Sequence, residues 1–294
     1  MPTLLIFVIY LGVVLLLTAL LYYPLFQVVD AIWDVRPERV FYRLSMIIAA
    51  LGFWPLLMLL GINNRTALGF SLDRGRLLKT FSRGLGTGVM IMSVHAILLV
   101  LLGARVLEPG YIQFSALSTV LVTGLLSGIL VAVIEEIFFR GAMQYHMRRS
   151  SSMLATAIMT NLLFASVHFI RPPVAAEGAV IGWYSGWEML AGIFHRYDNF
   201  AGFADSFIAL FAAGLLLSLV RERTGHLTLC IGIHAGWVWV IKLASEVTKA
   251  DTHSPTAFLI GGYDNITGWA ATGVLGLVTV WYWRYGRVVY HSNG

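Results

Sequence analysis

The sequence predicts an all-α fold, a polytopic transmembrane helix bundle with about eight spans. Hydrophobic residues make up 58% of the 294 residues and charged residues only 12%, and the mean hydropathy is +0.79. A chain of this composition lacks the polar surface that a soluble domain needs. Its apolar residues also gather in runs of about 20, the length of a helix that crosses a bilayer.

Eight apolar runs are long enough to be transmembrane helices. The first is too long for the hydrophobic region of a signal peptide and lacks a basic start, so we expect it to be retained. Residues 171–199 are aromatic and glycine-rich, which is typical of a loop at the outer membrane interface. The predicted spans are 4–26, 41–60, 84–102, 117–139 with a polar continuation to about 147, 153–170, 203–220, 227–244 and 266–283.

The net charge of +5 is spread over short loops between these spans, so it reports membrane topology and not a nucleic-acid partner. The distribution of lysine and arginine predicts that both termini are cytoplasmic, including the tail with Arg284 and Arg287. One outer loop fits this orientation least well. It carries two arginines among three acids: Arg36, Arg39, Asp30, Asp34 and Glu38.

The fourth span contains ionisable residues, with Glu135 and Glu136 near its end and Arg140 directly after it. An ionisable side chain within a span costs about 2.5–3.5 kcal/mol on insertion scales, so it indicates a functional site unless a partner explains it. Glu136 and Arg140 form an i, i+4 pair with the acid first, the favourable order on a helix. Glu136 therefore also has a structural interpretation, as the anchor of Arg140 in the bundle.

Small residues precede this pair at intervals of four, at Gly124, Gly128 and Ala132. Such a stripe lets a second helix approach closely. Glu135 points about 100° away from the stripe, given the helical period, and the sequence offers it no cation one turn away. We therefore expect Glu135 to have a role other than packing.

Two further spans carry histidines, His168 and His234. The serine turn at 150–152 lies midway between Glu135 and His168, so an antiparallel hairpin would bring the two to one level, roughly 20 Å from the turn. Asn161 and Phe164 share a predicted helix face with His168. His234 reaches the same depth only if the hairpin protrudes into the cytoplasm.

A carboxylate beside a neutral imidazole can remove a proton from water and return it to a leaving amine. A second imidazole or an amide could stabilise the oxyanion of a tetrahedral intermediate. Two histidines and a glutamate are also a known catalytic zinc ligand set, and their spacing does not decide between these chemistries. Cys230 is the only cysteine, which excludes a disulfide framework or a cysteine metal cluster within one chain.

Three ordered motifs resemble those of the CAAX-protease and bacteriocin-processing (CPBP, or Abi) intramembrane peptidases. The segment 135–141, EEIFFRG, matches the EExxxR motif; FASVH at 164–168 matches FxxxH; and LTLCIGIHAGW at 227–237 is similar to the third motif. The resemblance covers about residues 117–245, a four-helix catalytic core. It implies that Glu135 activates water with His168 as its partner, that Glu136 and Arg140 support them, and that His234 lines the oxyanion site.

One position departs from this pattern. Eukaryotic-type prenyl-protein endopeptidases of the family carry an asparagine four residues after the last histidine, where this chain has Val238. A strict CAAX prenyl-protein activity is therefore less expected, with Asn161 as a weak substitute for the missing donor. The family also contains regulators and scaffolds.

Together these observations predict N-terminal spans in 1–116, a CPBP-like core in 117–245, and an outer loop, last span and cytoplasmic tail in 246–294. We expect a glutamic-type endopeptidase of a prokaryotic plasma (inner) membrane that cleaves a membrane-anchored protein or peptide. The alternatives are a zinc-dependent peptidase, and a non-catalytic scaffold or proton-coupled carrier that uses the same charges. We expect no cofactor, because a ligating histidine needs a second acceptor and Glu136 is already assigned to Arg140.

Overall fold

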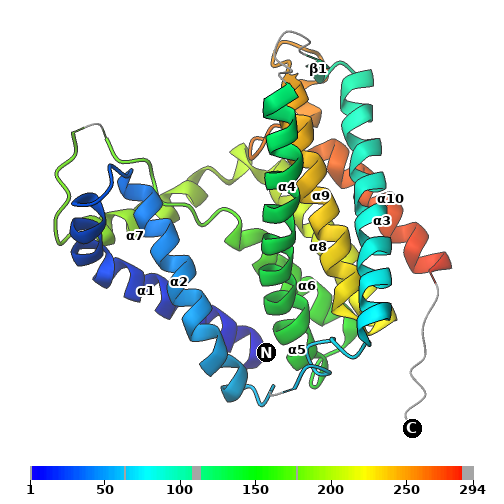
Figure 1. The fold of residues 1–294 in the computed structure, drawn as a ribbon, viewed down its shortest axis with the longest axis horizontal. Coiled ribbons are helices and arrows are strands. Elements are labelled where there is room, and N and C mark those ends of the chain that lie inside the picture. The colour runs from blue at the N-terminus through cyan, green and yellow to red at the C-terminus, as the bar shows by residue number, and fades with distance from the viewer. Residues whose placement is uncertain (1, 63, 108–113, 177, 287–294) are drawn as a thin grey trace. The chain divides into compact units, whose positions relative to one another are not determined.

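The structure, a computed structural model, describes residues 2–62, 64–107, 114–176 and 178–286. These residues form ten α-helices, one π-helical segment, two short 3-10 segments and two three-residue strands, so the fold is all-α as predicted. Figure 1 shows these elements along the chain. Their bounds are α1 Pro2–Asp30, α2 Pro37–Leu59, α3 Arg74–Leu101, β1 Arg105–Leu107, α4 Phe114–Glu136, η1 Ile137–Gln144, α5 Tyr145–Arg148, α6 Met153–Val167, α7 Ser185–His195, η2 Arg196–Gly202, α8 Ala204–Thr224, α9 Leu227–Val247, β2 Thr248–Ala250, η3 Ala257–Leu259 and α10 Trp269–Tyr285.

Six described helices are long and apolar enough to cross a membrane, two fewer than the eight predicted spans. The other two predicted spans correspond to α6, of 15 residues, and α10, of 17 residues. Pro172 and Pro173 follow α6 closely and disfavour helical backbone before them, which limits its extension. Before α10, the carboxylate of Asp264 accepts hydrogen bonds from the backbone N–H groups of Ile266 and Thr267, so these two residues lie in a turn and not in the helix.

The prediction of an irregular interfacial loop at 171–199 is wrong for residues 185–195. They form α7, whose buried face includes Met189 and Ile193. A Cβ on Gly186 would overlap the carbonyl oxygen of Ala19, so α7 approaches the backbone of α1 very closely. The predicted cytoplasmic tail lies outside the described residues from 287 onward.

The contacts divide the chain into two compact units. Unit 1 comprises residues 1–63 and 166–200, and unit 2 comprises 64–165 and 201–294. In unit 1, α1 packs against α2 and α7 around a core that includes Tyr22, Phe41 and Ile193.

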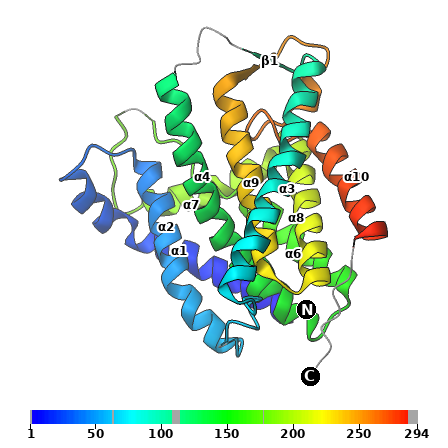
Figure 2. The same ribbon diagram turned by 45° about the vertical axis from the view of Figure 1, so that its right-hand side comes forward.

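Unit 2 is organised around α9, which packs between α3 and α4 (Figure 2). Glycines make the first of these contacts close. A Cβ on Gly88 of α3 would overlap the carbonyl oxygen of Ile233, and one on Gly232 of α9 would overlap that of Phe81. Gly84 and Gly236 complete two facing small-xxx-small pairs, the arrangement that brings membrane helices into backbone contact. At the ends of α3 and α9, β1 and β2 pair antiparallel, with Val106 opposite Lys249.

The predicted small-residue stripe of the fourth span faces α9. A Cβ on Gly128 would lie 2.9 Å from the carbonyl oxygen of Ala235 and 3.5 Å from Cβ of Val238. Ala132 is fully buried against Leu227, Ile231 and Ala235. The close helix contact inferred from the four-residue interval is therefore present.

Candidate active site

The fourth span changes its helical type at the charged motif. Glu135 and Glu136 are the last residues of α4, and Arg140 lies in the π-helical segment η1, which α5 then continues. A π-helix has i→i+5 hydrogen bonds, is rare, and occurs often at functional sites. The sequence predicted a regular α-helix here.

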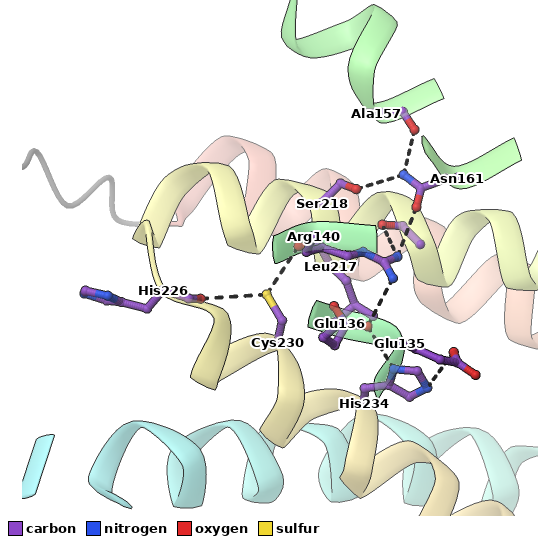
Figure 3. Close-up of polar contacts among 11 residues, drawn as sticks. Glu135, Glu136, Arg140, Ala157, Asn161, Leu217, Ser218, His226, Cys230 and His234 are labelled. Carbon is purple, nitrogen blue, oxygen red and sulfur yellow. Dashed lines mark hydrogen bonds and ion pairs between the residues drawn. The ribbon is translucent and has the colours of Figure 1, made fainter. Parts of the chain in front are cut away.

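Glu136 binds two cationic or polar partners through one oxygen. Its Oε1 lies 3.1 Å from Nη1 of Arg140 and 2.9 Å from Nδ1 of His234 (Figure 3). The carboxylate and the guanidinium are fully buried, and the side chain of His234 is 8% exposed. The i, i+4 pair predicted from the sequence is present, and α9 supplies a third member that the sequence analysis had not connected to it.

The charge of this group fixes the tautomer of His234. An ionised Glu136, paired with Arg140, can only accept hydrogen bonds, so Nδ1 of His234 must carry a proton. In the neutral ring that is the only proton, and Nε2 then presents a lone pair. In the imidazolium form Nε2 is also a donor.

Glu135 faces the second ring nitrogen of His234. Its Oε2 lies 3.8 Å from Nε2, so the two glutamates lie at opposite nitrogens of one imidazole (Figure 3). The Glu135 side chain is 25% exposed, whereas that of Glu136 is completely buried. Adjacent carboxylates therefore differ in access: the side chain of Glu135 is partly exposed, although its Oε2 is buried, whereas Glu136 is completely buried.

Arg140 is enclosed by unit 2. Its Nη2 donates to Oδ1 of Asn161 at 3.0 Å and to the carbonyl oxygen of Gly214 at 3.2 Å. Its guanidinium also stacks on the ring of Phe164, 4.4 Å from the centroid, a cation–π contact. A Cβ at position 214 would overlap Oδ1 of Asn161, so only glycine allows this approach.

Asn161 is held by two further hydrogen bonds. Its Nδ2 donates to the carbonyl oxygen of Ala157 at 2.7 Å and to Oγ of Ser218 at 2.9 Å. An amide nitrogen has two N–H donors, and both are used in these contacts. Asn161 thus supports Arg140, and its geometry gives no donor for an oxyanion.

The helix that carries the motif pairs with α8 in a constant register. Arg140 contacts Gly214, Nε2 of Gln144 donates to the carbonyl oxygen of Ser218 at 3.1 Å, and Arg148 forms an ion pair with Glu222 at 2.9 Å. Each partner is 74 positions later, so the two segments run parallel. The contacts with Ser218 and Glu222 of α8 were not predicted from the sequence. Gln144 and Arg148 nevertheless continue the four-residue interval that begins with Glu136 and Arg140.

Residues 117–240 match the family model described as "Type II CAAX prenyl endopeptidase Rce1-like". The matched region, which is less than half of the chain, is similar to the Rce1-like members of the CPBP family. This similarity supports an intramembrane protease. Comparison with curated proteins and with solved structures found no significant match.

The Rce1-like region includes residues of both units, and His168 lies in a different unit from the other predicted site residues. Helix α6 ends at Val167, so His168 lies in the turn after the helix and not on it as predicted. It belongs to unit 1, whereas Glu135, Glu136, Arg140, Asn161 and His234 belong to unit 2. The pairing of His168 with Glu135 stays a prediction.

Val238, where eukaryotic-type members carry asparagine, packs at the seam between α4 and α9 of the Rce1-like region beside Gly128. Its neighbour Trp237 is buried, and its ring centroid lies 6.4 Å from that of His234. Within the described part of the chain the indole N–H of Trp237 has no hydrogen-bond partner. This donor was not predicted from the sequence.

The absence of a metal stays a prediction. Glu136 pairs with Arg140, as expected from the sequence, but the same oxygen of Glu136 also binds Nδ1 of His234. A carboxylate at one ring nitrogen is the usual support for a metal-ligating histidine. Among the described residues, however, no group of three or more His, Cys, Asp or Glu side chains is arranged to hold a metal ion.

Proposed function

We propose that the chain is a glutamic-type intramembrane endopeptidase, in which Glu135 and His168 activate water to hydrolyse a peptide bond of a membrane-associated protein or peptide. The main support is the difference in access between adjacent glutamates. Glu136 is sealed between Arg140 and His234, while Glu135 is 25% exposed at the other nitrogen of the same ring. A base that must meet water and substrate needs such access.

In the proposed reaction the Glu135 carboxylate takes a proton from water. The water oxygen bonds to the carbonyl carbon of the substrate, and the carbonyl π electrons move to its oxygen. The tetrahedral intermediate then collapses: the C–N bond breaks, and the proton held by Glu135 or His168 passes to the leaving nitrogen. The products are a carboxylic acid and an amine.

His234 can act in this reaction in one form only. An oxyanion donor at Nε2 requires the imidazolium, because Nδ1 uses the single proton of a neutral ring in its contact with Glu136. Glu136 and Arg140 would hold the ring in place and would not contact the substrate, because both are fully buried.

The substrate is proposed to be a CAAX-type or similar membrane-anchored polypeptide, as the description of the matching family suggests. The valine at 238 argues against a strict prenyl-protein specificity. We further propose a prokaryotic plasma membrane location with both termini cytoplasmic.

A zinc-dependent mechanism is the second candidate, and one observation favours it. Neutral His234 with its proton on Nδ1 presents the lone pair of Nε2 beside Glu135, as a metal ligand would. Metal analysis of the active protein separates the two mechanisms.

A substrate trap tests the proposed function directly. Glu135→Gln keeps the size of the side chain and removes the base, so we expect this variant to retain the substrate in membranes. Terminal mapping of the captured polypeptide should then give the bond that the wild-type protein cleaves. Glu246→Gln, in the exposed last turn of α9, is the matched control and should cleave normally. Wild-type cleavage by Glu135→Gln would rule out Glu135 as the base, whereas a wild-type protein that cleaves no membrane polypeptide would favour a scaffold or carrier.

A further inference from the structure

Unit 1 contains a cavity that has no part in the proposed catalysis. Its volume is about 430 Å³, and it lies beside the first two turns of α2, where the chain after α6 adds two residues to its wall. The lining residues are Glu38, Arg39, Tyr42, Arg43, Arg171 and Pro172.

The cavity is positively charged. Three arginines and one glutamate line it, which gives a formal charge of 3 − 1 = +2. Arg39 and Arg43 are exposed, and neither forms an ion pair with another described residue. Tyr42, whose side chain carries a hydroxyl, lines the same cavity. The nearby acids Asp30 and Asp34 line a neighbouring cavity with Tyr23 and Gln27.

An apolar stripe continues from the arginines along the same helix. Arg39 and Arg43 are followed, at intervals of three or four residues, by Ile47, Leu51, Trp54 and Met58. These four side chains are 55%, 72%, 69% and 67% exposed. Helix α2 is long and apolar enough to cross a membrane. The stripe extends about 22 Å along this helix from Arg43, at 1.5 Å rise per residue.

In the predicted orientation these arginines lie on the outer side of the membrane. Lysine and arginine gather in cytoplasmic loops, and this loop is the one that the predicted orientation places outside. Arginines that do not set topology need another role. Guanidinium groups bind phosphate through paired N–H donors in a planar fork, and more than one of them here faces the same cavity.

We propose that this cavity binds the phosphate of an anionic phospholipid headgroup, with the acyl chains of the lipid lying along the exposed apolar stripe of α2. The phosphate contacts Arg39 and Arg43, two exposed arginines of the cavity, at the membrane interface. The net charge of +2 selects an anionic lipid over a zwitterionic one, and the stripe selects a lipid over a soluble phosphate. This site is independent of the proposed peptidase activity.

The test uses the full chain in detergent, with thermal unfolding and native mass spectrometry as readouts. We expect phosphatidylglycerol to bind and to raise the melting temperature, and phosphatidylcholine to do neither. Arg39→Gln with Arg43→Gln should weaken phosphatidylglycerol binding at least tenfold. The matched control is the double variant Lys79→Gln with Arg83→Gln, which removes an exposed i, i+4 basic pair on α3 and leaves Arg39 and Arg43 intact. This control should bind phosphatidylglycerol like the wild type.

Two results would overturn the proposal. In one, the Arg39 and Arg43 double variant binds phosphatidylglycerol as tightly as the control pair. In the other, inorganic phosphate alone stabilises the wild-type protein as much as the lipid does, which would assign the cavity to a soluble anion. If the double variant does not fold, Arg43→Gln alone takes its place, with Arg83→Gln as its control.

Discussion

The Nδ1 atom of His234 lies 2.9 Å from Oε1 of Glu136, a carboxylate that is completely buried. The same oxygen accepts a hydrogen bond from Arg140. A single buried atom therefore joins α4, the π-helical segment and α9. Because neither partner can turn without losing this contact, the ring of His234 is held with its second nitrogen toward Glu135.

We predict that Glu135→Gln and His168→Ala each lower the rate of peptide cleavage by at least about 100-fold, since positioned acid–base groups contribute 10²–10⁴. Both variants should stay folded in membranes, because the side chains of Glu135 and His168 are both only partly buried. Cleavage by the purified variants, compared with Glu246→Gln, is the measurement. Near wild-type turnover in either variant would contradict its assignment.

Glu136→Ala and Arg140→Ala should lower both stability and activity. Each leaves the other residue as an uncompensated buried charge, which costs about 3–5 kcal/mol. Glu222→Ala is the control, because its partner Arg148 is 34% exposed and a partly exposed pair contributes about 0–1 kcal/mol. Thermal unfolding in detergent measures the difference. Equal melting temperatures for all three variants would show that the buried pair is not structural.

The contact between α3 and α9 provides a third prediction. Gly88→Ala places a methyl group on the carbonyl oxygen of Ile233, next to His234, whereas Gly86→Ala on the same helix meets nothing within 4 Å. We expect Gly88→Ala to reduce the melting temperature and the cleavage rate. Gly86→Ala should be neutral or stabilise the helix by about 0.5–1 kcal/mol. If the two substitutions changed the melting temperature and the cleavage rate equally, the close contact at Gly88 would not be needed for either.

The metal question has a direct test. We predict that the purified active protein contains no stoichiometric metal and keeps its activity after treatment with a chelator. Elemental analysis and cleavage assays before and after chelation are the measurements. One zinc per chain, with activity lost on chelation and regained with zinc, would make His234 a ligand and the protein a metallopeptidase.

Patterns of residue type and spacing predicted the local parts of this site. The pair of Glu136 and Arg140 and the packing of Gly128 follow from intervals of four residues on one helix, which are fixed by helical geometry. The contact of His234 with Glu136 joins residues 98 positions apart, and no local rule reports the rotation of α9 that brings them together. The same limit hid the support of Arg140 by Gly214.

Helix ends and helix type were less predictable. The spans were predicted from apolar runs, but the helix in the run that reaches residue 170 ends at Val167. The prolines that follow limit the helical backbone and do not change the hydropathy on which the prediction was based. The helix α7 was missed, since its residues are rich in glycine and aromatics and its helical state depends on packing against α1. The π-helical geometry has no composition signal of its own.

That geometry makes the length of the segment part of the site. A π-helical turn holds about one residue more than an α-helical turn, since its hydrogen bonds close at i+5 and not at i+4. Deleting one residue between Glu136 and Arg140 would remove that extra residue and let the chain return to an ordinary α-helix, with the side chains beyond the segment near their present directions. Gln144 and Arg148 would then keep their contacts with Ser218 and Glu222, but Glu136 and Arg140 would lie three residues apart and not four. A single deletion at this point would therefore act on the charged centre and leave the contact with α8 in place.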